Sequence, residues 1–335
     1  MEYMLSFIIP VYNRPDEIGD LLNSMVEQKS QEPFEVVIIE DGSTLDASRV
    51  VQWYRDLLDI SYFQKPNSGP GDSRNYGMKH AKGNYFIILD SDCILPPQYL
   101  ETVKRELDTD FVHCFGGPDN AHESFSKVQK AINYAMTSFF TTGGIRGGKK
   151  AVDRFQPRSF NMGISKTAFE KVGGFGQIHP GEDPDLTFRI WNAGFTTRLF
   201  PKAFVYHKRR IDWNKFWIQV NKFGMVRPIL NKWHPKTKRL TYWFPTFFML
   251  GLLTAIVLAV FGYHLPLLGY GLYFSLLFFH SLIRNQDIFV AIMSLWAVLI
   301  QFAGYGYGFL KSTILVNFSA KEPQTIFPKL FFKRP

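Results

Sequence analysis

Two long stretches without a charged side chain constrain the fold of this chain more than any other feature. No Asp, Glu, Lys or Arg occurs from Thr241 to Ile283, and none from Ile288 to Leu310. A helix of a water-soluble domain needs a solvated polar face, so membrane insertion is favoured over the alternative of buried core helices. At about 20 residues per span, the stretches divide into three segments, near 242–262, 265–283 and 288–310.

A strongly basic stretch leads into the first apolar segment. Between Lys202 and Arg239 there are eleven Lys or Arg residues and one acidic residue, Asp212, in a chain whose net charge is +9. This is the pattern of a cytoplasmic flank, and it suits attraction to anionic membrane lipids. We expect no nucleic-acid partner, because no recognised nucleic-acid motif accompanies the charge.

The side of the membrane on which the last residues lie is left open by the sequence. The run from Leu5 to Tyr12 is too short for a signal peptide, so the first domain is expected in the cytoplasm. Three crossings would then put residues 311–335 outside, although they carry five Lys or Arg and one Glu, which favours the inside. Either one segment is re-entrant, or the glycine-rich part at Gly304–Gly308 does not cross.

Short apolar runs alternate with helical patterns over the first ninety residues. Strands are predicted at Leu5–Val11, Phe34–Ile39, Ile60–Phe63 and Tyr85–Leu89. Helices are predicted at Pro15–Met25, Asp46–Leu58 and Asp72–Lys82. This rhythm predicts an α/β domain with a doubly wound, mostly parallel sheet, whose ligands bind beyond the carboxyl ends of the strands.

Polar clusters follow several of the predicted strands. They are P-V-Y-N at residues 10–13, E-D-G-S at 40–43, D-S-D at 90–92, G-E-D-P-D-L at 181–186, and His207. Each has an ordinary explanation, since Asp and Asn are common turn and cap residues. Occurring together and in this order, they indicate one site. Cys93 and Cys114 have no metal-type spacing and are expected to be ordinary buried residues.

These clusters resemble glycosyltransferase family 2, the inverting enzymes with a GT-A fold, over residues 5–210. Further motifs that carry the resemblance are S-R-N-Y-G at 73–77, N-M-G-I at 161–164 and V-G-G-F at 172–175. The apolar region is similar to that of membrane-tethered bacterial members that build cell-surface polysaccharides. The resemblance therefore implies a multi-pass protein of the bacterial inner membrane with a cytoplasmic catalytic domain.

The resemblance also implies roles for individual residues. A nucleotide-sugar donor would be bound by Pro10, Tyr12, Asn13, Glu40, Asp41, Arg74, Asn75, Asp90 and Ser91. A divalent cation, Mg²⁺ or Mn²⁺, would be held by Asp92 with His207, because both cations favour oxygen ligands and bridge phosphates. Asp183 would be the base that deprotonates the acceptor hydroxyl, with Glu182 as the runner-up.

The expected organisation has four parts: a GT-A domain at 1–210, a basic interfacial helix or linker at 211–240, a transmembrane region at 241–312, and a basic tail at 313–335. Within the linker, a helix is expected from Trp213 to about Leu230. The glycine-rich stretch at 118–160 is expected to be a disordered loop or a lid that contacts the acceptor.

The expected reaction is transfer of one sugar to a lipid-linked or membrane-proximal acceptor. Processive synthesis is disfavoured because Gln219–Phe223 departs from the Q-x-x-R-W pattern of processive synthases, with Lys222 in place of Arg. Two alternatives remain open. One is a polyprenyl-phosphate sugar synthase, whose phosphate acceptor needs no base, and the other is a non-catalytic membrane scaffold with a degenerate nucleotide-binding domain.

Overall fold

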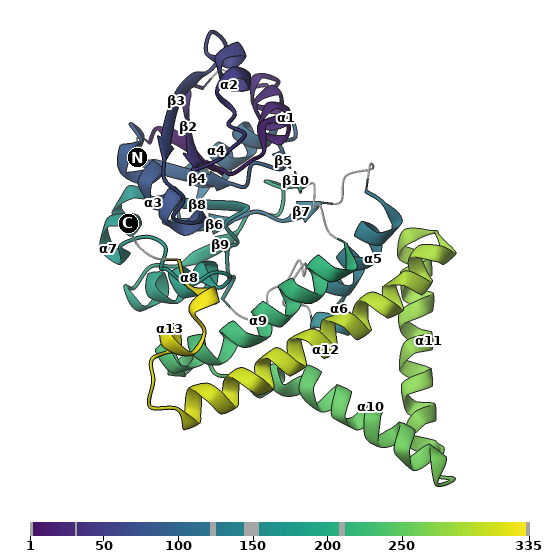
Figure 1. Ribbon diagram of the computed structural model, residues 1–335. Helices are drawn as coiled ribbons and strands as arrows, with labels where there is room; N and C mark the ends of the chain where they lie inside the picture. Colours follow the sequence, from purple (N-terminus) through teal and green to yellow (C-terminus); the bar gives the residue numbers. More distant parts are fainter. Residues whose placement is uncertain (1–2, 31, 121–124, 144–153, 208–211, 333–335) are drawn as a thin grey trace. The chain divides into compact units, whose positions relative to one another are not determined.

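The computed structural model describes residues 3–30, 32–120, 125–143, 154–207 and 212–332 (Figure 1). The described residues form two compact units. The first contains those of 3–120 and 154–207 together with Phe331 and Phe332, and the second contains the rest. The break near residue 208 lies close to the predicted boundary at 210. Residues 125–143, which the prediction put in the first domain, belong to the second unit.

A seven-stranded sheet with the order β3-β2-β1-β4-β8-β6-β9 forms the centre of the first unit. Its strands are β1 (Leu5–Val11), β2 (Phe34–Asp41), β3 (Asp59–Lys65), β4 (Tyr85–Leu89), β6 (Cys114–Gly116), β8 (Asn161–Ser165) and β9 (Thr197–Leu199). The first four strands are parallel, whereas β8 runs antiparallel to β4 and β6. The predicted doubly wound, mostly parallel sheet is therefore confirmed.

Helices cover both faces of this sheet. Residues of α1 (Pro15–Val26), α2 (Ser48–Tyr54) and α4 (Tyr99–Thr109) share one apolar cluster with Phe7 and Ile9 of β1. Residues of α3 (Pro70–His80), α7 (Lys166–Val172) and α8 (Glu182–Asn192) share the other with Ile8. Alternate residues of a strand point to opposite faces, so a sheet covered on both faces needs strands that are apolar almost throughout.

A small second sheet, with the order β5-β10-β7, brings distant residues to the end of β4. Its strands are β5 (Cys93–Ile94), β7 (Asp119–Asn120) and β10 (Val205–His207). In the antiparallel pairing of β10 with β5, His207 lies opposite Cys93. This register places His207 beside Asp92, the residue that precedes β5.

The second unit is helical in the residues that the structure describes. It contains α5 (Lys127–Thr137), α6 (Phe139–Thr142), α9 (Trp213–Trp233), α10 (Phe244–Val260), α11 (Leu265–Asn285), α12 (Ile288–Phe318) and α13 (Pro323–Ile326). The expectation of a loop over 118–160 is wrong for α5 and α6. Ser126 and Gln129 form a capping box at the start of α5, a signal present in the sequence. Most of the glycine-rich basic run, residues 144–153, lies outside the described residues.

Three helices of the second unit are long and apolar enough to cross a membrane, at Leu240–Val260, Leu265–Asn285 and Ile288–Phe318. They differ in burial. In each of the first two helices, 11% of the most apolar 18-residue stretch is buried inside the protein, whereas in the third helix the share is 44%. The third, α12, packs on α9 through glycines. A Cβ atom added to Gly308 would lie 2.3 Å from the backbone oxygen of Asn221, and one added to Gly304 would lie 2.6 Å from Val220 Cγ2. The two helices therefore approach as closely as in small-xxx-small pairs.

This packing predicts different effects for two glycine-to-alanine substitutions. Gly308→Ala should lower the free energy of unfolding by about 1–3 kcal/mol, because the methyl group overlaps the α9 backbone. Gly271→Ala on α11, where nothing lies within 4 Å of the added Cβ, should be neutral or slightly stabilising. Thermal unfolding in detergent measures both, and equal midpoints for the two variants would contradict the close packing.

Candidate active site

Asp92 is the centre of the first polar cluster, at the carboxyl end of β4. It is 7% exposed, and its Oδ1 lies 3.0 Å from His207 Nε2. Arg14 Nη1 donates to its Oδ2 at 2.5 Å. Burial alone would raise the pKa of Asp92, but the hydrogen bonds and charges of His207 and Arg14 lower it to about 2. The carboxylate therefore stays ionised throughout the neutral range.

The donor atoms around Asp92 fit a divalent cation. Ligand atoms of Asp92, Cys93 and His207 lie within 4.8 Å of one another. Burial raises the pKa of the Cys93 thiol well above its usual range, so it is a poor ligand compared with the carboxylate and the imidazole. Asp90 lies nearby, with Oδ2 at 3.9 Å from His207 Nε2. A carboxylate with an imidazole suits Mn²⁺, and Mg²⁺ through the carboxylate.

A second cluster begins α8 and is joined to the first by Arg74. The Arg74 side chain is 4% exposed; its Nη2 donates to Asp90 Oδ1 at 2.8 Å and its Nη1 to Glu182 Oε1 at 3.3 Å. On the other side, His179 Nδ1 lies 2.9 Å from the same Oε1. One buried guanidinium thus links a residue of the first cluster to the acidic pair of Glu182 and Asp183.

The two acids of this pair differ in pKa. Burial opposes ionisation of Glu182, yet the charge and hydrogen bond of His179 and the charge of Arg74 lower its pKa to about 2. Burial raises the pKa of Asp183 to about 6, and the negative charge of Glu182 adds to that increase. Neighbouring titratable groups with separated pKa values are a mark of acid-base sites. Asp183 is the member suited to accept a proton near neutral pH.

Some residues predicted to bind the nucleotide are exposed to a ligand, and others form hydrogen bonds within the protein. Tyr12 is 52% exposed at the end of β1, so its ring is accessible to a ligand. Asn13 and Glu40 instead hold the turn after β2. Asn13 Oδ1 accepts from the backbone N–H groups of Thr44 and Leu45, while Glu40 Oε2 accepts from Ala47 N–H and from the Tyr62 hydroxyl.

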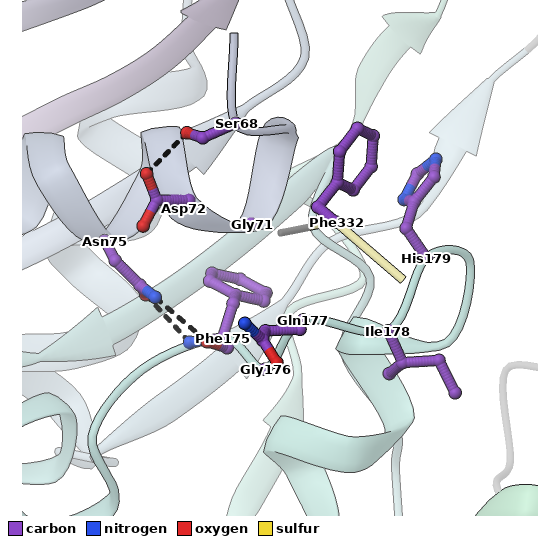
Figure 2. A pocket seen from close by; sticks show the side chains of 10 residues that line it. All are labelled: Ser68, Gly71, Asp72, Asn75, Phe175, Gly176, Gln177, Ile178, His179 and Phe332. Carbon is purple, nitrogen blue, oxygen red and sulfur yellow. Dashed lines mark hydrogen bonds between the residues drawn. The ribbon is translucent and has the colours of Figure 1, made fainter. Parts of the chain in front are cut away.

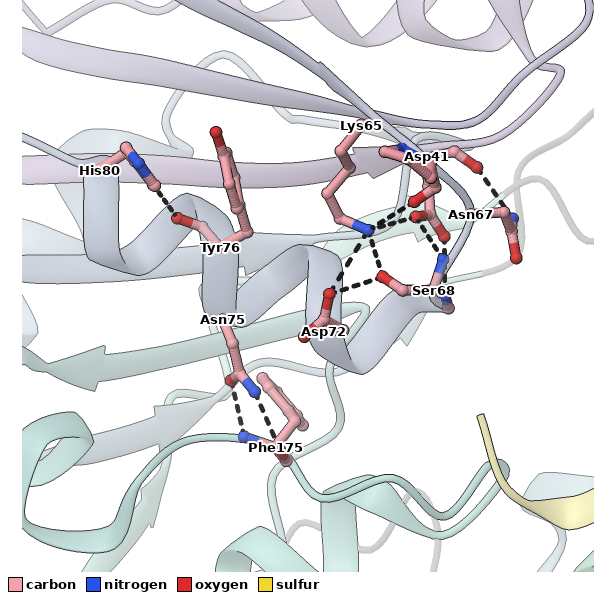
Figure 3. A network of polar contacts seen from close by, with 11 residues as sticks. Asp41, Lys65, Asn67, Ser68, Asp72, Asn75, Tyr76, His80 and Phe175 are labelled. Carbon is pink, nitrogen blue, oxygen red and sulfur yellow. Dashed lines mark hydrogen bonds and ion pairs between the residues drawn. The ribbon is translucent and has the colours of Figure 1, made fainter. Parts of the chain in front are cut away.

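Asp41 and Asn75 also hold the backbone (Figure 3). Asp41 accepts from Lys65 Nζ at 2.5 Å and from the N–H groups of Ser68 and Gly69 at 3.0 and 2.9 Å. Asn75 brackets Phe175, donating to its carbonyl and accepting from its N–H. Most of the hydrogen-bonding capacity of these two side chains is thus already used within the protein. Direct nucleotide contacts by Asp41 and Asn75 stay predictions.

The remaining predicted residues lie at strand ends. Pro10 pairs with Ile39 in the register of β1 with β2, and Ser91 is buried between Asp90 and Asp92.

Two contacts at the site were not foreseen from the sequence. Arg14 directly follows the P-V-Y-N cluster, but nothing in its spacing indicates a contact with Asp92. His179 precedes Glu182 by three residues, and a lone histidine in a loop gives no further signal.

Comparisons with known proteins identify the family of the chain. A family model described as glycosyl transferase family 2 matches residues 6–173. A hyaluronan synthase from Pasteurella multocida is 34% identical over 238 residues, which is 61% of this chain and 24% of the synthase. An uncharacterized glycosyltransferase from Rickettsia bellii is 34% identical over 131 residues, which is 39% of this chain and 18% of that protein. The chain thus spans less than a quarter of the length of either relative.

Among solved structures, a mannosyltransferase from Pyrobaculum calidifontis in complex with GDP-Man and Mn²⁺ has a similar fold. The TM-score is 0.50 at 13% identity, over 98% of this chain and 79% of that one. This likeness, with the parallel sheet described above, supports the expected GT-A fold.

The linking role of Arg74 predicts a large loss of stability when it is removed. Arg74→Met should lower the free energy of unfolding by about 3–5 kcal/mol, because it leaves Glu182 buried with one fewer compensating charge. Lys82→Met is the matched control, since Lys82 and its partner Asp59 are 55% and 52% exposed and such surface pairs contribute little. Thermal unfolding compares the two, and an unchanged midpoint for Arg74→Met would contradict the linking role.

Proposed function

We propose, from the premise that this chain belongs to glycosyl transferase family 2, that it moves one sugar from a UDP-sugar to a hydroxyl of a lipid-linked or membrane-proximal acceptor in cell-surface glycan synthesis. The observation that carries the proposal is the link, through Arg74, between a cation-type cluster and an acidic pair of unlike pKa. A donor phosphate and an acceptor hydroxyl need these two kinds of group close together.

The donor is held at the first cluster. Asp92 and His207 would hold the divalent cation, which when bound would supply Lewis-acid chemistry by neutralising charge on the diphosphate leaving group. Tyr12 offers its exposed ring to the base of the nucleotide. Asp90 is oriented toward the same site by the hydrogen bond that it accepts from Arg74.

The acceptor is activated at the second cluster. Asp183 takes the proton from the acceptor hydroxyl as its oxygen attacks the anomeric carbon, and the bond to the diphosphate breaks in the same displacement. Glu182 stays ionised and holds His179 and Arg74 in place. The reaction is a single displacement that needs no second carboxylate as a nucleophile. The configuration at the anomeric carbon therefore inverts.

The apolar helices and the basic α9 support a reaction at a membrane. We assign the catalytic unit to the cytoplasmic face of a bacterial inner membrane, where α10 and α11 present apolar side chains to lipid. Nucleotide-sugars are then available to the donor site, and the acceptor is presented by the bilayer.

The donor assignment predicts metal-dependent binding that requires Asp92. The detergent-solubilised protein should bind a UDP-sugar more tightly with Mn²⁺ than without it. The Asp92→Asn protein should lose that difference, because one oxygen ligand of the cation is lost. Asp59→Asn, at an exposed carboxylate (52%) on β3, is the control and should bind as the unmodified protein does. Equal binding by all three proteins would argue against a cation at Asp92.

The base assignment predicts a loss of turnover without a loss of donor binding. The Asp183→Asn protein should show a kcat lower by about 10²–10⁴-fold and an unchanged dissociation constant for the donor. In the unmodified protein, kcat/KM should rise with pH through about 6, since the base must be deprotonated to act.

Asp56→Asn, at an exposed position, serves as the control for Asp183→Asn and should retain both activity and the pH profile. Full activity of the Asp183→Asn protein toward a phosphate acceptor would instead indicate a polyprenyl-phosphate sugar synthase. No transfer from any nucleotide-sugar by folded, unmodified protein would indicate the scaffold alternative.

A further inference from the structure

A short segment returns from the second unit to the first. Phe331 and Phe332 follow α13 in the sequence, yet they belong to the first unit. Phe331 forms an antiparallel bridge with Ile178, and Phe332 N–H donates to the carbonyl of Gln177 at 3.0 Å. The segment therefore adds a strand-like edge to the loop between α7 and α8.

The Phe332 ring packs between two parts of the candidate site. A Cβ atom added to Gly69 would lie 2.4 Å from the ring carbons, so the ring lies directly on the Gly69 backbone. On its other side, the centroids of the Phe332 and His179 rings are 5.7 Å apart. Figure 2 shows both rings at the hollow that Ser68, Asp72 and Asn75 also line.

The loop that this segment touches carries the candidate base. It runs from Phe175 to Gly181 and leads directly into Glu182 and Asp183, the first residues of α8. Gly174 and Gly181 have positive φ angles, and Gly176 lies between them, so the loop has much conformational freedom to lose. Asn75 holds its first residue through two hydrogen bonds. The middle of the loop is held by Phe331 and Phe332.

We propose that Phe331 and Phe332 are positioning residues for transfer: they clamp the 175–181 loop and so place the acidic pair of α8. The clamp acts through His179, which contacts Phe332 on one side and Glu182 on the other. The catalytic part of this proposal rests on the proposed function. The docking of the segment does not, and it is tested separately.

The docked segment also limits how the chain crosses the membrane. The chain leaves the first unit after His207 and re-enters it at Phe331. Because that unit lies on one side of the bilayer, the intervening helices cross an even number of times. No more than two of the three apolar helices then span. Lys321 and Lys329, which lie between the end of α12 and the docked segment, are then on the catalytic side, as the positive-inside rule favours.

A designed disulfide tests the docking in membranes. Paired residues of antiparallel strands have Cα atoms about 4.5–5.5 Å apart, within disulfide range, so Ile178→Cys with Phe331→Cys should cross-link on oxidation. Both native cysteines are buried and free. Leu57→Cys with Phe331→Cys is the control, because Leu57 is 63% exposed and outside the docking loop. The expected result is a bond in the first pair alone, seen as protection of both thiols from maleimide. Unprotected thiols in the first pair, or equal protection in both, would overturn the docking and the crossing rule.

Turnover tests the positioning role. Phe332→Ala should lower kcat by about 10–100-fold, because small displacements of reacting groups have effects of that size, and should leave the donor dissociation constant unchanged. Phe332→Leu keeps an apolar side chain against Gly69 and should restore most of the activity. Wild-type kcat in Phe332→Ala would overturn the positioning role, as would an equal loss in both variants. A lack of transfer by the unmodified protein would refute the proposed function instead, with the cross-linking result unaffected.

Discussion

The candidate site depends on one buried guanidinium. Arg74 places positive charge between Asp90, which follows β4, and Glu182, which begins α8. Burying carboxylates so close together is unfavourable unless a cation and hydrogen bonds compensate them. The planar fork of arginine can serve two carboxylates at once. Because Arg74 is itself held in α3 against the sheet, it couples the geometry of the donor cluster to that of the acidic pair.

The same charge distribution separates the functions of the acids. His207 and Arg14 keep Asp92 ionised, and His179 and Arg74 keep Glu182 ionised. Asp183 is left with the raised pKa that a proton acceptor needs. The loop before α8 keeps this arrangement only while it is itself held in place, by Asn75 at its start and by Phe331 and Phe332 at its middle. Distant parts of the sequence thus converge on the placement of one carboxylate.

The sequence predicted the features that are encoded locally. Apolar runs bounded by turns gave the first four strands, because a sheet covered on both faces leaves that pattern. Asp92 and His207 were grouped from motif order, and the pairing of β10 with β5 brings them together. His179 and Phe332 could not be found in this way, since their roles arise only from contacts between distant segments. Apolar composition likewise identified α12 without revealing that glycines bury one side of it against α9.

In the proposed mechanism, Asp183 is the base in a single displacement, with no covalent sugar intermediate. The configuration of the first product tests this most directly. Proton NMR of the glycoside formed at early times, with a donor of known anomeric configuration, reports whether the bond has inverted. The proposed single displacement predicts inversion. A product that retains the donor configuration would exclude a single backside displacement and would contradict the assignment of Asp183 as its base.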